Sequence, residues 1–211
     1  MIDQLQYITQ DYDQASHSLL CLEACQAGVK WVQLRMKNAS DEEYLKIARL
    51  CRKITADHGA KLIINDNLNI ALEVGADGVH LGQTDMNTRE ARGKAPEGFI
   101  IGGTANTLEQ IIDHFNNGVD YVGVGPYRFT PTKDNLSPVL GREGYEEIIK
   151  ELANKNIDLP VIAIGGITED DVEILRKTGV HGIAISGLIT KSLEKKELVE
   201  VLQKQLNYAT A

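Results

Sequence analysis

The chain has 211 residues, a formal net charge of −8 and 43% hydrophobic residues, a composition typical of a globular protein with a sizeable core. The acidic balance, without a Lys/Arg run, argues against general binding to nucleic acid or to anionic membranes. No apolar run approaches the ~20 residues of a membrane span, and the first residues lack the charged start and apolar stretch of a signal peptide. Three cysteines, Cys21, Cys25 and Cys51, lie in helix-like stretches, so we expect reduced thiols and a cytoplasmic location.

Short β-rich runs alternate with helical patterns along the chain. Eight runs are expected to form strands: 6–9, 31–35, 61–65, 78–81, 99–103, 121–125, 160–165 and 182–186. Between them lie amphipathic stretches such as 40–58, in which apolar residues recur at helical spacing. Strands that alternate with helices imply a parallel sheet. Eight such units favour an α/β fold, a single compact (β/α)8 TIM barrel that takes residues 1–211 as one domain.

Helix boundaries are marked by capping residues. Ser40 and Thr168 each precede a run of acidic residues, which predicts that both are helix N-caps. Several helical stretches stop at a glycine just before the next strand, where glycine supplies a left-handed cap: Gly28, Gly75, Gly118 and Gly179.

The second strand and its exit carry alternating polar residues. Gln33, Arg35 and Lys37 share one face, while Leu34 and Met36 point the other way. An amphipathic edge strand would explain this pattern, but a closed barrel has no edge. We therefore predict that the two cations face the barrel mouth and bind a polyanion.

Polar residues also end the third and fourth strands. Asn65 and Asp66 follow the third strand, and Asp85 comes soon after the fourth. Because neighbouring strands lie about 4.8 Å apart, the two carboxylates can converge on Mg²⁺, which prefers few carboxylates plus substrate phosphate. The alternative makes Asp66 a helix N-cap and Asp85 a turn residue. His80, inside the fourth strand, is expected to be a hydrogen-bonded core or supporting residue rather than a catalyst.

The later strands end in small or hydroxyl-bearing residues. Thr104 follows Gly102 and Gly103, and its hydroxyl either contacts a substrate or caps the next helix. Glycines and helix starts after strands seven and eight form a phosphate site in many barrels. Here those positions are Gly165-Gly166-Ile167-Thr168 and Ile185-Ser186-Gly187.

A long stretch without regular structure, 126–142, follows the sixth strand on the face where barrel active sites lie. Within it, Thr130-Pro131-Thr132-Lys133 offers two hydroxyls and an ammonium, which predicts a phosphate clamp. A surface turn with an exposed lysine is the alternative. Two anion sites without an obvious nucleophile–base pair indicate group transfer with a diphosphate leaving group.

Five motifs, in order and register, resemble the thiamine-phosphate synthase family, also called thiamine-phosphate pyrophosphorylase. They are Gln33-Leu34-Arg35-Met36-Lys37, Asn65-Asp66, the run 80–85, Thr130-Pro131-Thr132-Lys133 and the run 165–168. The resemblance covers about 6–187. It implies a transferase that joins hydroxymethylpyrimidine diphosphate to a thiazole phosphate by a dissociative step, giving thiamine phosphate and pyrophosphate.

The resemblance also implies roles for individual residues. The pyrimidine diphosphate is expected to contact Gln33, Arg35, Lys37, Asn65, Thr104 and Lys133, and the thiazole phosphate to contact Thr130, Thr132, Gly166, Ile185 and Ser186. Further substrate contacts are expected at Leu34, Met36 and Pro131, and the catalytic set is Arg35, Lys37, Thr104 and Lys133. Asp66 and Asp85 are expected to bind Mg²⁺. The expected partners are these small molecules, with no nucleic acid and no membrane, and association into a homo-oligomer is compatible with the sequence.

Two other functions are compatible with the same fold. A sister branch, the thiazole tautomerases, typically carries a histidine where this chain has Asn106, and that difference favours the synthase. A non-catalytic, regulatory phosphate-binding barrel could dispense with Asp66 and Asp85, so their presence argues against it. Members of the family usually have apolar residues and a proline where this chain has Tyr127-Arg128-Phe129, and Arg128 either contacts a phosphate or faces solvent.

Overall fold

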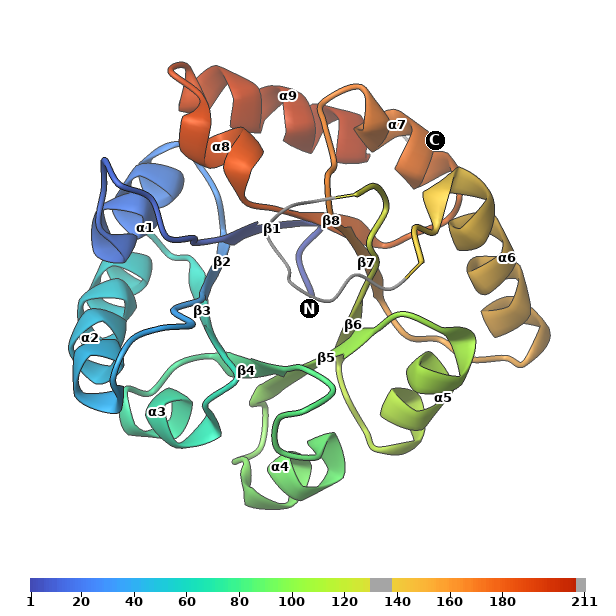
Figure 1. Ribbon diagram of the computed structural model, residues 1–211, viewed down its shortest axis with the longest axis horizontal. Helices are drawn as coiled ribbons and strands as arrows, with labels where there is room; N and C mark the ends of the chain where they lie inside the picture. The colour runs from blue at the N-terminus through green and yellow to red at the C-terminus, as the bar shows by residue number, and fades with distance from the viewer. Residues whose placement is uncertain (130–137, 208–211) are drawn as a thin grey trace.

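The computed structural model describes residues 1–129 and 138–207. Eight parallel strands form a closed barrel in the order of the sequence, and β8 pairs with β1 to complete the ring (Figure 1). The strands are β1 (Leu5–Ile8), β2 (Trp31–Leu34), β3 (Lys61–Asn65), β4 (Gly78–Leu81), β5 (Ile100–Ala105), β6 (Tyr121–Val124), β7 (Val161–Ile164) and β8 (Gly182–Ile185). The predicted (β/α)8 barrel is confirmed.

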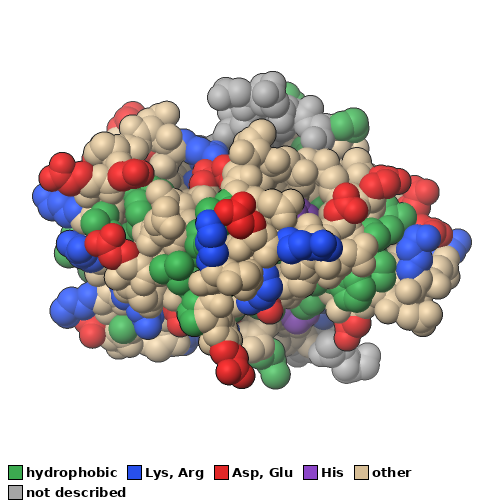
Figure 2. All heavy atoms as spheres, turned by 90° about the horizontal axis from the view of Figure 1, so that it is seen from below, with side chains coloured by type: hydrophobic (Ala, Val, Ile, Leu, Met, Phe, Trp, Pro, Cys, Tyr) green, Lys and Arg blue, Asp and Glu red, His purple; other side chains and the backbone are tan. Residues whose placement is uncertain are grey.

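Helices surround the barrel as an outer ring (Figure 1). They are α1 (His17–Gln26), α2 (Asp41–Asp57), α3 (Leu68–Glu73), α4 (Thr88–Lys94), α5 (Leu108–Asn116), α6 (Gly141–Asn154), α7 (Asp171–Lys177), α8 (Gly187–Lys191) and α9 (Lys195–Asn207). Within residues 1–129 and 138–207, no helix has the length and apolar character needed to cross a membrane. On the face shown in Figure 2, acidic and basic side chains are interspersed.

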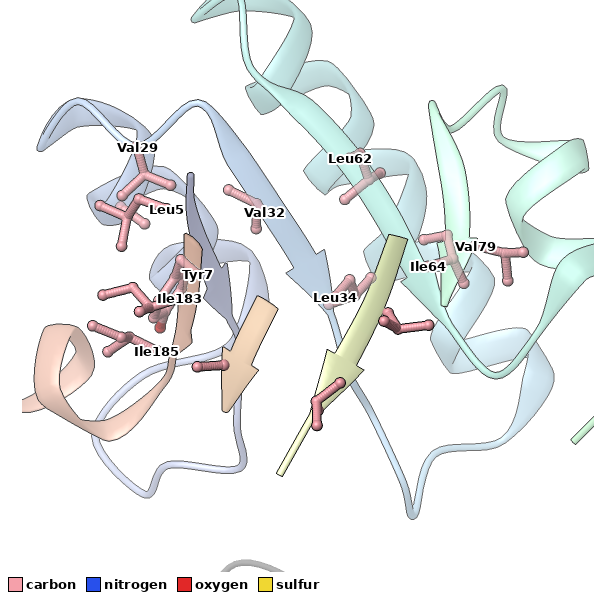
Figure 3. Close-up of a cluster of buried hydrophobic side chains, with 14 of the residues drawn as sticks. Leu5, Tyr7, Val29, Val32, Leu34, Leu62, Ile64, Val79, Ile183 and Ile185 are labelled. Atoms are coloured by element: carbon pink, nitrogen blue, oxygen red, sulfur yellow. The ribbon is translucent and has the colours of Figure 1, made fainter. Parts of the chain in front are cut away.

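Alternation along each strand divides the core into two layers. One set of side chains fills the space between the sheet and the helices, and part of it, including Leu5, Leu34 and Ile185, is drawn in Figure 3. The other set fills the inside of the barrel, where Trp31 packs edge to face against Tyr121 with ring centroids 4.8 Å apart. The inward-facing side chains nearer the mouth of the barrel are mostly polar, so this end of the barrel can bind a polar ligand.

Helix capping follows the sequence at most positions. The side chain of Ser40 accepts a hydrogen bond from the backbone N–H of Glu43, as predicted. The glycines that stop the helices adopt left-handed φ values, as predicted: Gly28, Gly75, Gly118 and Gly179.

The predicted N-cap at Thr168 is wrong. The helix begins at Asp171, and the hydroxyl of Thr168 donates to the Asp171 carboxylate at 2.7 Å. The physical reason is that Asp171 is buried and takes up the hydrogen-bond donors around it, so the threonine hydroxyl donates instead of accepting from the helix.

The three cysteines are free, buried thiols: Cys21 and Cys25 belong to α1, and Cys51 belongs to α2. Hydrogen bonding to Cys21 and burial raise the pKa of the Cys25 thiol. All three thiols are therefore protected from solvent in the folded protein.

Candidate active site

A cavity opens at the carboxyl ends of the strands, where inward-facing side chains of several strands meet. Its lining comprises Gln6, Ile8, Gln33, Arg35, Asn65, His80, Thr104, Gly123, Ile164 and Ala184. Four of the predicted site residues, Gln33, Arg35, Asn65 and Thr104, therefore share one cavity although three intervening helices separate them in sequence. Polar groups on a buried barrel wall need partners or a ligand.

Lys37 and Asp66 meet beside this cavity. The Lys37 Nζ lies 2.5 Å from Asp66 Oδ2, and both side chains are partly exposed. Asp66 adopts a left-handed φ of 68°, which is uncommon for a non-glycine residue. Asn67, not Asp66, caps α3 by accepting the N–H of Ile70 at 3.0 Å. The alternative that Asp66 serves as the N-cap is therefore wrong, and its carboxylate pairs with Lys37 instead.

The Asp85 carboxylate lies close to that of Asp66. Its Oδ2 accepts the backbone N–H of Gly82 at 2.6 Å, so Asp85 also closes a tight turn. Burial raises the pKa of Asp85, the adjacent Asp66 carboxylate raises it further, and the Gly82 N–H partly opposes both. The two negative carboxylates repel each other, so a cation between them would be stabilised.

The donor set at this place suits Mg²⁺. Carboxylate oxygens are hard ligands, and Mg²⁺ commonly takes one or two of them together with water and phosphate oxygens. In the described part of the chain, no cluster of three or more His, Cys, Asp or Glu side chains could hold a metal ion. A metal here would thus depend on Asp66, Asp85 and the oxygens of a ligand.

A buried chain of hydrogen bonds runs across the cavity floor. Gln33 Nε2 donates to Gln6 Oε1 at 3.3 Å, and Gln6 Nε2 donates to the Tyr121 hydroxyl at 3.2 Å. That hydroxyl lies 3.0 Å from His80 Nδ1, and His80 Nε2 lies 2.9 Å from Thr104 Oγ1. His80 is buried, and its place between Tyr121 and Thr104 is that of a supporting residue.

Thr104 is held through its backbone as well. Its carbonyl oxygen accepts from His114 Nε2 at 2.9 Å and from Gln83 Nε2. Thr107, not Thr104, caps α5, so the alternative that Thr104 is a helix cap is wrong. Its hydroxyl lines the cavity instead.

Sequence reasoning missed Gln6, Tyr121 and His114. The signal that could have found the two ring-bearing residues is the pair of glycines before Thr104. A Cβ on Gly102 would lie 2.2 Å from Tyr121 Cζ, and one on Gly103 would lie 2.6 Å from His114 Cε1. Both glycines are therefore needed for the rings to approach β5.

The turn after β7 is built from glycine backbone. Gly165 and Gly166 have left-handed φ values of 100° and 67°. A Cβ on Gly166 would come within 3.0 Å of Arg128 Cβ and 3.1 Å of the Phe129 carbonyl oxygen. The segment after β6 thus packs directly on this turn, and Arg128 N–H donates to the Gly165 carbonyl at 3.0 Å.

Arg128 is bound to α7 rather than being free in solvent. Its guanidinium makes two hydrogen bonds to the Asp171 carboxylate, of 2.7 and 2.6 Å, and lies 5.2 Å from the centroid of the Tyr127 ring. Asp171 is only 1% exposed. This paired fork braces the segment that leads into the loop after β6.

Some predicted contacts lie elsewhere. The Leu34 and Ile185 side chains are buried between the sheet and the helices, and Met36 packs against the same layer, so these side chains point away from the cavity. The Ser186 hydroxyl donates to Gln10 Oε1 at 2.9 Å. The predicted clamp residues Thr130, Pro131, Thr132 and Lys133 lie outside the described residues.

Comparisons with known proteins agree with one another. The sequence model of the family described as thiamine monophosphate synthase matches residues 5–189. The chain is 47% identical to the thiamine-phosphate synthase of Bacteroides thetaiotaomicron over 188 residues, which are 89% of this chain and 90% of that protein. It is 45% identical to the thiamine-phosphate synthase of Flavobacterium johnsoniae, across 98% of this chain and 97% of that one.

A solved structure is similar over the same extent. The thiamine phosphate pyrophosphorylase of Pyrococcus furiosus superposes with a TM-score of 0.85 at 32% identity, covering 99% of this chain and 97% of that one. The similarity therefore extends over the whole barrel.

Proposed function

The chain belongs to the thiamine monophosphate synthase family, and we propose that it is the transferase that joins hydroxymethylpyrimidine diphosphate to a thiazole phosphate. The products are thiamine phosphate and pyrophosphate. The observation that carries this proposal is the meeting of Lys37, Asp66 and Asp85 beside a cavity lined by Arg35 and neutral polar groups. Cations next to paired carboxylates suit a diphosphate with a divalent metal, and the neutral groups suit a polar ring.

We assign the two ends of the pyrimidine substrate to different parts of the site. Gln33, Asn65 and Thr104 hold the ring in the cavity, and Arg35 and Lys37 bind the diphosphate at the mouth. Asp66 and Asp85 would hold Mg²⁺, which when bound would supply positive charge next to the diphosphate. Lys133, on the strength of the sequence alone, adds a further cation.

The reaction then follows from charge. The bond between the exocyclic carbon and the diphosphate oxygen breaks, and its electron pair leaves with pyrophosphate. The electron-rich ring stabilises the resulting carbocation, and the thiazole nitrogen donates its lone pair to form the new C–N bond. The negative charge that develops on the leaving group is stabilised by the cations of Arg35, Lys37 and Lys133. This interaction is stronger in the transition state than in the ground state.

The second substrate is assigned to the opposite side of the mouth. We propose that the thiazole phosphate binds at the turn of Gly165 and Gly166 and near Ser186, with Thr130 and Thr132 completing the site. Support comes from the left-handed glycine turn and from its place after β7, where many barrels bind phosphate. We also propose a cytoplasmic location, which the free thiols support.

Neither alternative function gains support from the relatives, which carry the synthase name. In this chain Asn106 takes the place expected for a tautomerase histidine, and its amide donates to the Gly125 carbonyl at 2.5 Å. That contact holds the exit of β6, which is a structural role.

The direct test is to incubate the purified protein with both substrates and Mg²⁺ and to assay thiamine phosphate and pyrophosphate. We expect both products in equal amounts, and no product from folded protein would contradict the proposal. Aromatised thiazole phosphate formed without the pyrimidine would instead indicate a tautomerase, and phosphate-ligand binding without either reaction would indicate a regulatory barrel.

Lys133→Ala should lower kcat more than it raises the KM of the thiazole phosphate, because Lys133 is proposed to stabilise the charge that develops on the leaving group.

A further inference from the structure

The buried hydrogen-bond chain on the cavity floor has a direction. Each of its links joins one donor to one acceptor, so reversing one link reverses its neighbours. In one sense the Gln33 amide nitrogen points to Gln6 and its carbonyl oxygen is left for the cavity. In the opposite sense the Gln33 nitrogen is left for the cavity. Thr104 then donates to His80 and offers the cavity an acceptor instead of a donor.

The orientation of the Gln6 amide sets the sense of the chain, and this sense reaches His80 through Tyr121. The Tyr121 hydroxyl oxygen accepts from the Gln6 amide, and the Gln33 amide lies near enough to act as a second donor. Burial raises the pKa of Tyr121, so the hydroxyl keeps its proton and must donate it. The acceptor within reach is His80 Nδ1 at 3.0 Å.

The tautomer of His80 follows from this. Because Nδ1 accepts from Tyr121, it carries no proton, and the ring proton of His80 is on Nε2, which lies 2.9 Å from Thr104 Oγ1. The Thr104 oxygen then accepts from His80, and its own hydrogen is directed to another acceptor. Since Thr104 lines the cavity, that hydrogen is available to an acceptor on a ligand.

The packing around the chain keeps these groups in place. Tyr121 and Gly102 are register partners on β6 and β5, and the ring of Tyr121 lies where a Cβ on Gly102 would be. A Cβ on Gly123 would lie 3.2 Å from His80 Cε1. Gly102 and Gly123 therefore leave the space that the rings of Tyr121 and His80 occupy, and a side chain at either position would displace a ring.

We propose that His80 and Tyr121 are positioning residues that fix the hydrogen-bond polarity of the cavity, so that Gln33 presents an acceptor and Thr104 presents a donor to the ligand. The matching ligand is a ring with both an N–H donor and a lone-pair acceptor on its edge. An aminopyrimidine has this pattern in its exocyclic amino group and ring nitrogens. This inference rests on the proposed function and adds how the site distinguishes an amino ring from an oxo ring.

The test uses a pair of ligands with inverted polarity. An oxopyrimidine diphosphate carries a carbonyl acceptor in place of the amino donor and an N–H in place of the adjacent ring nitrogen. Calorimetry in the presence of Mg²⁺, without thiazole phosphate, gives the Kd of each ligand. We expect the wild-type protein to bind the amino ligand at least about tenfold more tightly, since a site built to hydrogen-bond one pattern leaves its polar groups unpaired with the other.

Tyr121→Phe removes one hydroxyl and breaks the chain at its centre. We expect the preference for the amino ligand to fall to about threefold or less, because Gln33 and His80 can then adopt either sense. Tyr7→Phe is the matched control, since Tyr7 is an equally buried barrel tyrosine whose hydroxyl contacts Thr190 at 2.8 Å outside the cavity. The control should keep the full preference. An unchanged preference in Tyr121→Phe would overturn the proposal.

A second measurement needs no substitution. ¹⁵N NMR of the wild-type protein reports which nitrogen of His80 carries the proton, and we expect Nε2–H. An Nδ1–H tautomer or an imidazolium would overturn the proposal even if Tyr121→Phe does not fold. Failure of the proposed function is distinguishable, because it appears as an absence of thiamine phosphate in the product assay while the ligand preference and the tautomer are measured independently.

Discussion

The two sides of the barrel mouth are built from different material. After β2, β3 and β4 the site consists of charged and polar side chains, such as Lys37 and Asp66, that stand on a rigid sheet. After β7 it consists of a glycine turn, on which the segment after β6 packs through Arg128. A side chain on the sheet can be replaced without a change in backbone conformation. A side chain added to the glycine turn changes the backbone and the segment packed on it. Substitutions on the first side should therefore alter chemistry at little cost in stability, and those on the second should alter both.

The largest effect is expected at the paired carboxylates. Asp66→Asn or Asp85→Asn should lower turnover at least about tenfold, because each would remove a negative ligand proposed to hold Mg²⁺ beside the leaving group. The activity should also require more Mg²⁺, as a titration of initial rate against metal concentration would detect.

The exposed pair of Asp57 and Lys53 provides a matched control. Its Nζ to Oδ2 distance is 2.9 Å, so it resembles the pair of Asp66 and Lys37 but lies on α2 away from the cavity. Asp57→Asn should leave the rate unchanged. Full activity in both site variants, or wild-type activity that EDTA does not reduce, would remove the metal from the proposal.

The next effect is expected at the glycine turn. Gly166→Ala should raise the KM of the thiazole phosphate by roughly three- to tenfold with little change in kcat, because uniform binding is lost. Steady-state kinetics with each substrate varied in turn measures this. The added Cβ would lie 3.0 Å from Arg128 Cβ and 3.1 Å from the Phe129 carbonyl oxygen, closer than ordinary van der Waals contact, so the segment after β6 must shift by a few tenths of an ångström.

Gly75→Ala separates this effect from backbone strain. Gly75 has a φ of 63°, close to that of Gly166, and a Cβ there meets nothing within 4 Å. Both variants should lose about 1–2 kcal/mol of unfolding free energy from the left-handed conformation. A raised KM in both, or in neither, would contradict the assignment of this turn to the thiazole phosphate.

A smaller effect on activity, with a clear effect on stability, is expected for Asp171→Asn. The buried carboxylate accepts two bonds from Arg128 and two from Thr168. Its replacement should cost about 1–3 kcal/mol of unfolding free energy, which corresponds to roughly 2–4 °C of melting temperature for each kcal/mol. Thermal unfolding followed by circular dichroism measures this, and the thiazole KM should rise about threefold because the turn is less well braced. An unchanged melting temperature would show that the pair does not hold the segment after β6.

The smallest effect is expected for Arg128→Lys. The guanidinium is 51% exposed, and lysine keeps the charge but cannot form the two-pronged contact. We expect a loss below about 1 kcal/mol and less than about a twofold change in the thiazole KM. A loss as large as that of Asp171→Asn would mean that the fork, and not the buried carboxylate, is the main support of this side of the mouth.

The sequence predicted the barrel well, since every strand was expected within two residues of its observed ends. Local signals suffice for this: apolar runs, helical spacing and glycine stops. The neighbourhood of Asp66 and Asp85 was also predictable, because parallel strands adjacent in sequence end at the same edge of the sheet. In the motif around Gln33, strand alternation correctly turned Leu34 away, although the family pattern assigned it a substrate contact.

The remaining features depend on partners that are distant in sequence. Gln6 and Tyr121 are 115 positions apart, and no local pattern connects them. Thr168 failed as a helix cap because Asp171, held by Arg128 from 43 positions away, takes up its hydroxyl. Polar partners of this kind appear only when the closed barrel brings the strands together.

The buried thiols of α1 and α2 can be used to detect unfolding of this part of the protein. Cys21, Cys25 and Cys51 are buried, so a thiol reagent should modify them only when this region unfolds. The rate of their modification therefore measures local or global opening without an added label. A single cysteine introduced on the surface could be derivatised first, under native conditions, and used to follow ligand binding while the native thiols remain silent.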